Sequence, residues 1–284
     1  MKRYLHTLAL VVILIVLTVA RGVSQQPSSE SDSTAVSDLP EEVTITILRD
    51  EDSRECRYQL YGCVAYLVDV DSLRIWLGFW QPKIAEQAGT SWDDMDVIFV
   101  PDANNSTISS LKIESLQGRF YLGNCVIAPP HDGRWLEKNK GLASQVTLVD
   151  RPMKLADHVY STGAVYPPHF NSRARGIHAI IVETERGLVV ATECRTSHIA
   201  LLVKTAKEYL KQDILLVIGG YGDDEPLSSI DLELESEELQ HLGVSYFASL
   251  SCSRLDPGVG LEKAFGDHYL TPRVGDTLRI SELE

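Results

Sequence analysis

The feature that most constrains the fold is an alternation of apolar strands and helices in the C-terminal half of the chain. Segments 187–193 (GLVVATE), 213–220 (DILLVIGG) and 244–251 (VSYFASLS) are short apolar runs, and helical patterns at 199–210 and 232–242 separate them. Short runs of this kind are typical of strands covered on both faces. Strands that alternate with helices indicate an α/β fold, in which helices pack on the faces of a sheet.

The N-terminal half contains further strands. Segments 61–70 and 73–79 are apolar runs on either side of a plausible hairpin turn at Asp71-Ser72, and 95–101 is a nearly continuous apolar strand that ends at Pro101. Loops that follow such strands usually carry the chemistry of an α/β fold. The other predicted elements are strands at 43–50, 120–128, 145–150, 178–184 and 277–280, a short helix at 84–89, and a helix start at Ser91 and Asp94.

The first forty residues are predicted to lie outside the fold. Lys2 and Arg3 precede an apolar run of 13 residues, Leu8–Ala20, and small residues follow it. This pattern predicts an export signal at 1–24, and the run is shorter than the roughly 20 residues of a spanning helix. An uncleaved membrane anchor is the alternative. Residues 25–41 are rich in Ser and poor in apolar residues, which predicts a disordered tether before a folded domain at 42–284.

The charge balance excludes some classes of partner. The chain has 26 Lys and Arg against 40 Asp and Glu, a formal net charge of −14. Nucleic-acid binding, or docking on anionic lipid, would need clustered basic residues, so contact with a membrane is expected only through an uncleaved N-terminal segment. Five Cys are too few for a disulfide scaffold. The export signal predicts a periplasmic or extracellular location, with membrane anchoring as the alternative.

Four separated loops carry a resemblance to a known family. Segment 187–222 (GLVVATECRTSHIALLVKTAKEYLKQDILLVIGGYG), then LGVSYFASLSCS and AFGD, resembles the C-terminal half of metallo-β-lactamase-fold proteins, and it is most similar to the dihydropterin-synthase-like branch. In the N-terminal half, RIWLGFW and MDVIFVPDANNST are similar to the family's Leu-Phe-Asp-Thr-Gly and His-x-His-x-Asp-His segments. The resemblance covers about 42–284 and implies a four-layer αβ/βα sandwich with a metal site at its open edge.

The metal ligands of that family are missing from the matching positions. The family holds one or two zinc, iron or manganese ions on His and Asp side chains, and the ions activate a bound water. Pro, Ala and Gly offer no side-chain ligand, and Ser, Thr and Asn bind zinc or iron poorly. We therefore expect no metal cofactor and no catalytic residue at these degenerate positions, which are Pro101, Ala103, Asn105, Ser106, Thr196, Gly222 and Ser251.

A different site could have arisen in the same loops. Glu193, Cys194 and His198 lie on one short loop, although a histidine that precedes a helix is more often a solvated or capping residue. Asp223 and Asp224 have the position of carboxylates at a helix N-terminus, which the helix dipole favours without a metal. The candidate residual site consists of Asp102, Glu193, Cys194, His198, Asp223, Asp224 and Cys252.

Two bulky or charged features have structural interpretations. Trp76, Phe79 and Trp80 stand where the family has a metal-supporting loop, so we expect these aromatic side chains to fill part of the vacated pocket. The alternative is that they line an apolar ligand pocket. The stretch Asp223 to Glu238 holds eight acidic residues and no Lys or Arg, which predicts a solvated helix face, with partner or cation binding as the alternative.

Two functions follow from this pattern. The favoured hypothesis is an exported, non-catalytic pseudo-hydrolase that serves as a binding or structural module for a small molecule or a protein. The alternative is a metal-dependent, hydrolase-like enzyme with a rearranged site around Glu193, Cys194, His198 and Asp223. The two hypotheses differ in whether the folded protein retains a metal ion.

Overall fold

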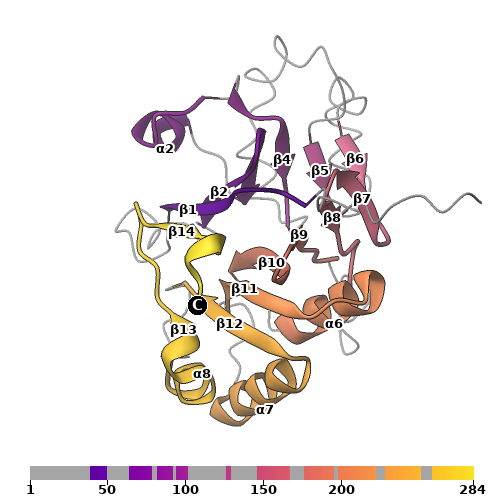
Figure 1. Cartoon of the computed structure of the whole chain (residues 1–284), viewed down its shortest axis with the longest axis vertical. Helices are drawn as coiled ribbons and strands as arrows, with labels where there is room; N and C mark the ends of the chain where they lie inside the picture. Colours follow the sequence, from indigo (N-terminus) through magenta and orange to yellow (C-terminus); the bar gives the residue numbers. More distant parts are fainter. Residues whose placement is uncertain are drawn as a thin grey trace, which may run out of the picture. The chain divides into compact units, whose positions relative to one another are not determined.

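The described strands form two sheets of seven strands each (Figure 1). The structure is a computed structural model, and all the residues that it describes belong to one compact unit, Asp38–Glu284. The described residues are 39–49, 64–78, 82–91, 94–101, 126–128, 146–166, 176–194, 198–221, 228–250 and 258–284.

The first sheet is built mainly from the N-terminal half of the chain and is closed by the C-terminal strand. Its first members are antiparallel and its last members are parallel. The strand order is β14 (Thr277–Arg279), β1 (Val43–Arg49), β2 (Ala65–Val70), β3 (Leu73–Gly78), β4 (Val97–Phe99), β5 (Val126–Ala128) and β6 (Val146–Leu148).

The second sheet is parallel where helices connect its strands. β10, β11, β12 and β13 are parallel neighbours, whereas β7, β8, β9 and β10 are antiparallel. The strand order is β13 (Tyr269–Leu270), β12 (Val244–Ser249), β11 (Ile214–Gly220), β10 (Gly187–Cys194), β9 (Ile180–Thr184), β8 (Val159–Ser161) and β7 (Met153–Ala156).

Two apolar cores define the layers. The first core joins the facing sides of the two sheets, with Ile45 and Val68 from the first sheet and Val189 and Leu216 from the second. The second core lies between the second sheet and its covering helices, which are α6 (Ile199–Leu210), α7 (Ser229–His241) and α8 (Gly258–Phe265). On the other side of the molecule, α2 (Pro82–Gln87) contacts β1. This α/β arrangement of two facing sheets with outer helices agrees with the predicted sandwich (Figure 1).

The sequence explains the bounds of the two central helices. In α6, Ile199, Leu202, Val203 and Ala206 recur at helical spacing and are buried. The helix ends at Leu210, and the C-cap residue Lys211 has a left-handed backbone. α7 begins at Ser229 because Ser228 forms a capping box: its hydroxyl accepts the Asp231 N–H while the Asp231 carboxylate accepts the Ser228 N–H. α7 therefore starts three residues before the predicted 232.

The structure also contains elements that the sequence patterns did not predict. The hairpin of β7 and β8, the helix α8 and the short strand β13 all lie in segments without a clear apolar period. Two 3-10 turns, η4 (Gly266–His268) and η5 (Ile280–Glu282), complete the C-terminal region. At Ser91 and Asp94, the Asp94 carboxylate accepts the Ser91 N–H and hydroxyl.

Of the described helices, none has the length and apolarity needed to cross a membrane.

Candidate functional site

The ends of several strands meet at one edge of the sandwich, which we call the mouth. β10, β11 and β12 run parallel, and their register pairs Cys194 with Gly220 and Gly219 with Ser249 at their carboxyl ends. The segment after β4 joins the same edge, because the Pro101 carbonyl accepts the backbone N–H of His178 at 2.9 Å. The mouth is therefore the place where the loops of the predicted site begin.

Only part of the predicted site lies within the described residues. Pro101 is buried at the end of β4, and His198 is half-buried at the N-cap of α6, where its side chain makes no capping hydrogen bond. Glu193 and Cys194 form the end of β10, but their side chains lie outside the described part of the structure. The other predicted positions also lie outside the described residues, namely Asp102, Ala103, Asn105, Ser106, Thr196, Gly222, Asp223, Asp224, Ser251 and Cys252.

A buried histidine, which the sequence reasoning had not singled out, binds the end of β4 to the second sheet. His178 is fully buried and its ring stacks on Phe99, with ring centroids 4.2 Å apart. Its Nε2 lies 2.6 Å from the Val100 carbonyl oxygen, and its Nδ1 lies 3.0 Å from Ser161 Oγ. Ser161 Oγ in turn accepts the Gly163 N–H at 3.0 Å.

These contacts fix the tautomer of His178. A carbonyl oxygen can only accept, so Nε2 carries the hydrogen, and the lone pair on Nδ1 accepts the Ser161 hydroxyl. Burial lowers the pKa of His178 to about 4, against the smaller opposing effect of the bond to Val100. The imidazole is therefore neutral at physiological pH, and both nitrogens are occupied within the fold. His178 positions the start of the loop at 101–106 and has no free lone pair for a metal ion.

A half-buried carboxylate of α7 lies beside the first turn of α6. Glu235 of α7 accepts the Ala200 N–H at 2.8 Å, and it also accepts the Ile199 N–H, so it satisfies donors in the first turn of α6. Burial raises the pKa of Glu235 to about 7 and the nearby Glu238 charge adds to this effect, whereas the two backbone bonds oppose it.

The acidic stretch is thus not uniformly solvated. Asp231, Glu233, Glu237 and Glu238 are exposed as predicted, but Glu235 points inward. The helical period explains the difference, because Glu235 lies beside Leu232, Ser236 and Leu239 on the buried side of α7.

Tyr221 lies at the end of β11, next to the first undescribed residue of the mouth. Its ring is parallel to that of Phe247, with ring centroids 6.3 Å apart, and its buried hydroxyl has no hydrogen-bond partner among the described residues. Burial raises the pKa of Tyr221 well above its usual value, and the Glu235 charge contributes in the same direction. Tyr221 therefore remains a neutral phenol beneath the mouth.

Trp76 does not extend into the space between the sheets. Its neighbours Ile75 and Leu77 belong to the core between the sheets, and side chains alternate along a strand. Trp76, which is fully buried, therefore lies on the outer face of the first sheet. The expectation that it fills the space of a metal centre is not supported by this orientation, and Trp80 lies outside the described residues.

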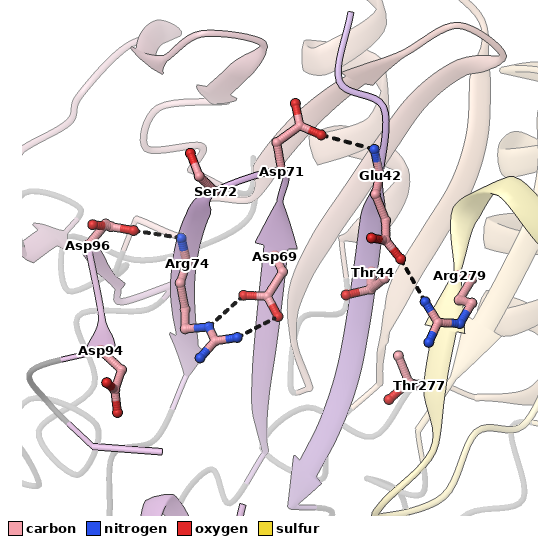
Figure 2. Close-up of a pocket in the computed structure, with 10 residues that line it drawn as sticks. All are labelled: Glu42, Thr44, Asp69, Asp71, Ser72, Arg74, Asp94, Asp96, Thr277 and Arg279. Carbon is pink, nitrogen blue, oxygen red and sulfur yellow. Dashed lines mark hydrogen bonds and ion pairs between the residues drawn. The ribbon is translucent and has the colours of Figure 1, made fainter. Parts of the chain in front are cut away.

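A polar groove lies on that outer face of the first sheet (Figure 2). Cross-strand register places Arg279, Thr44, Asp69 and Arg74 in one row over β14, β1, β2 and β3. The groove has a volume of about 610 Å³ and is lined by five carboxylates, two arginines and three hydroxyls: Glu42, Thr44, Asp69, Asp71, Ser72, Arg74, Asp94, Asp96, Thr277 and Arg279.

The carboxylates of this groove bond to groups of the fold itself. Asp69 accepts two bonds from the Arg74 guanidinium, at 2.8 and 3.4 Å, as Figure 2 shows. Asp71 accepts the Glu42 N–H at 2.9 Å, and Asp96 accepts the Arg74 N–H at 2.8 Å. Because Asp96 precedes β4 and the mouth follows it, the groove and the mouth lie at opposite ends of that strand. The groove is best explained as a set of turn and strand-end contacts.

The described residues at the mouth do not fit a divalent metal centre. Pro101, which the sequence resemblance aligns with a ligand position, has no donor side chain, and both nitrogens of His178 are engaged. Across the described residues as a whole, no three His, Cys, Asp or Glu side chains gather in a way that could hold a metal ion.

Comparisons with solved structures define the class of fold. Tm1679, a metal-dependent hydrolase of the β-lactamase superfamily, is 16% identical, with a TM-score of 0.56 over 83% of this chain and 98% of its own. The metallo-β-lactamase fold protein YhfI from Bacillus subtilis is 11% identical, with a TM-score of 0.54 over 84% and 100%. A diphosphatase from the PhnP family is 13% identical, with a TM-score of 0.53 over 84% and 97%.

The chain therefore has the metallo-β-lactamase fold, as the sequence resemblance predicted. No protein-family model and no curated protein sequence matches the chain. At these identities the likeness concerns the fold, so the activities of the similar proteins do not transfer to this chain.

Proposed function

We propose that the chain is a non-catalytic member of the metallo-β-lactamase fold that serves as a binding or structural module. The proposal rests on the chemistry of seven positions that the sequence resemblance aligns with metal ligands: they hold Pro, Ala, Asn, Ser, Thr, Gly and Ser, where the family has His and Asp. Pro101 supports the proposal. It is buried, and its carbonyl oxygen accepts the His178 N–H, so this residue contributes a backbone contact between the sheets and no side-chain metal ligand. The expected ligand is a small molecule or a protein.

We further propose that the domain is exported, on the basis of the N-terminal apolar run and its basic flank. The intact mass of the protein recovered from outside the cytoplasm of its host would test this. A mass that lacks about the first 24 residues is expected after signal cleavage. The full mass in a membrane fraction would favour the anchor instead, and recovery from the cytoplasm would contradict export.

A rearranged metal site is the second candidate. It is favoured by the strand register, which places the backbone of Cys194 beside Gly220, two residues before the Gly222 position, and by the location of His198 at the start of α6. In this candidate Glu193, Cys194, His198 and Asp223 would be the ligands. Cysteine and histidine are ligands that zinc and iron accept.

Metal analysis of the purified full chain separates the two candidates. After dialysis, the non-catalytic proposal predicts far less than one equivalent of zinc, iron or manganese per chain. Cys194→Ser and His198→Ala would then change nothing, and His241→Ala, on the exposed end of α7, is a matched control. A stoichiometric metal that Cys194→Ser or His198→Ala removes, and His241→Ala retains, would establish the rearranged site and overturn the proposal.

A further inference from the structure

α7 carries apolar side chains on two opposite faces. Leu232 and Leu239 are buried in the second core, whereas Ile230 and Leu234 point away from it and are 67% and 59% exposed. These two, which we call the apolar pair, are the most exposed large apolar side chains among the described residues. They are four residues apart, so they are neighbours on the helix surface and form one apolar patch.

Neither packing nor helix propensity explains the apolar pair. The packed sides of α7 are used by other residues: Glu235 accepts the Ala200 N–H of α6, and the Gln240 amide donates to the Ala264 carbonyl of α8. The isoleucine at position 230 is β-branched, and such residues form helices less readily than Glu, Gln or Lys. A solvated face with no other role would be expected to carry polar side chains at these two positions.

Exposed carboxylates surround the apolar pair. Helical spacing places Glu237 in the same row as the pair, with Asp231 and Glu238 on one side of that row and Glu233 on the other. Glu233 has an ion-pair partner in Lys263 of α8, at 3.8 Å. Within the described residues, Glu237 and Glu238 have none. The outer face of α7 is therefore apolar at its centre and anionic around it, as protein interfaces have an apolar core and a polar rim.

We propose that the outer face of α7 binds a basic amphipathic segment of a partner protein, in which a few apolar side chains are flanked by Lys or Arg. The apolar side chains of the segment cover the apolar pair, and its cations lie against Glu237 and Glu238. A second copy of this chain would bring the same carboxylates to the contact, and anionic lipid would bring phosphates, so like charges disfavour both. The proposal goes beyond the proposed function, because it assigns a partner chemistry to a surface outside the ligand positions of the mouth.

Peptide binding to the full chain tests this proposal. The probe is a fluorescent peptide of leucine and lysine with the length of α7, whose leucines form one helix face. Its scrambled counterpart has the same charge and no apolar face. We expect the native chain to bind the amphipathic peptide at least about tenfold more tightly than the scrambled one, because only the first can cover the apolar pair. Replacing the pair, by Ile230→Ser together with Leu234→Ser, should remove this preference.

Two matched controls separate the apolar and the charged contributions. Val274→Ser removes an apolar side chain that is 56% exposed outside α7, and it should retain the preference. Glu237→Gln should weaken the binding of both peptides and lower its dependence on salt, whereas Glu86→Gln, at an exposed position of α2, should change it less. If the serine variant fails to fold, amide chemical shifts of the native chain give the same decision, since the amphipathic peptide must then perturb α7.

Several results would overturn the proposal. These are equal binding of the two peptides by the native chain, a preference that survives in the serine variant, and shift changes that leave α7 unaffected. A dimer of the native chain that the serine variant disperses in sedimentation would assign the face to a second copy instead. Binding to phosphatidylcholine vesicles that the serine variant loses would assign it to lipid. None of these outcomes depends on whether a metal binds.

Discussion

The junction at His178 and the helix contact at Glu235 both place a titratable group beneath the mouth, but the two groups differ in burial and in their hydrogen-bond partners. His178 is fully buried, and each of its nitrogens has one partner of the matching type. Glu235 is less buried and accepts only N–H groups, and none of the described residues offers it a counter-charge. A closed hydrogen-bond network therefore fixes one protonation state, whereas an open network leaves two protonation states close in free energy.

The pKa shifts of the two groups have opposite consequences for stability. The pKa of His178 is lowered from 6.5 to about 4, so the unfolded chain binds more protons between these values, and stability is lost as the pH falls. The pKa of Glu235 is raised from 4.5 to about 7, so the folded chain binds more protons, and stability is lost as the pH rises. Between about pH 4.5 and 6.5 the two effects largely cancel.

The largest expected effect comes from breaking the His178 junction. His178→Ala should lower the free energy of unfolding by about 4 kcal/mol, because it leaves a cavity beside Phe99 and removes the partners of Val100 and Ser161. Urea denaturation at neutral pH measures the change. His268→Ala is the control, since His268 is exposed and stacks on Tyr246 at the surface, and it should cost much less. Equal losses of stability in His178→Ala and His268→Ala would contradict a larger contribution from the buried His178 contacts.

The loss of stability at acid pH that comes from His178 should become measurable in a variant whose residue 235 cannot ionise, because the opposite effect of Glu235 is then absent. In Glu235→Gln, we expect the His178 shift to remove about 3 kcal/mol of stability between about pH 6.5 and pH 4, at 1.36 kcal/mol for each pKa unit. Surface carboxylates with lowered pKa values, such as Asp94 and Asp231, add to the same acid limb. Denaturation curves of Glu235→Gln with and without His178→Asn isolate the histidine part. An identical acid limb in both would refute a neutral buried His178.

A smaller effect is expected at alkaline pH from Glu235 itself. Relative to the native chain, Glu235→Gln should be more stable by about 2 kcal/mol near pH 8.5 and equal to it near pH 4.5, because only the native side chain ionises. Thermal or urea denaturation at the two pH values measures the difference. A stability gain that is the same at both pH values would attribute the effect to packing.

The smallest effect is expected in the polar groove, where charges are exposed. Asp69→Asn removes the bidentate pair with Arg74, whose side chain is 40% exposed, and should cost less than about 1 kcal/mol. The cost should fall further at high salt. A loss of stability as large as that of His178→Ala would contradict the expectation that the exposed Asp69–Arg74 pair contributes less to stability than the buried His178 contacts.

Most of the scaffold could be predicted because it rests on local patterns. The strand at 214–220 and the helix at 199–210 follow directly from apolar periodicity. The roles of His178 and Glu235 could not be predicted in the same way. His178 stands before an ordinary apolar strand, and its partner Val100 is 78 residues away. Glu235 is one acid among eight, and only the packing of α7 on α6 turns it inward.

The candidate site was less predictable than the fold for a related reason. Asp102 and Gly222 lie outside the described residues, so their places in the site stay predictions, and no apolar period in the sequence fixes the position of such residues. The hairpin of β7 and β8 was not predicted, because strands of four and three residues are too short to show a recognisable alternation of apolar and polar residues in the sequence.

The pairing of β14 with β1 has a consequence for the time course of biosynthesis. Thr46 and Thr277 bond side chain to side chain across these strands although they are 231 residues apart. At a synthesis rate of about 5 to 20 residues per second, a ribosome makes β1 tens of seconds before it makes the strand that covers its edge. During that interval β1 has an unpaired edge, and the first sheet cannot be completed. The first sheet is therefore completed only after synthesis has reached the C-terminal residues of β14.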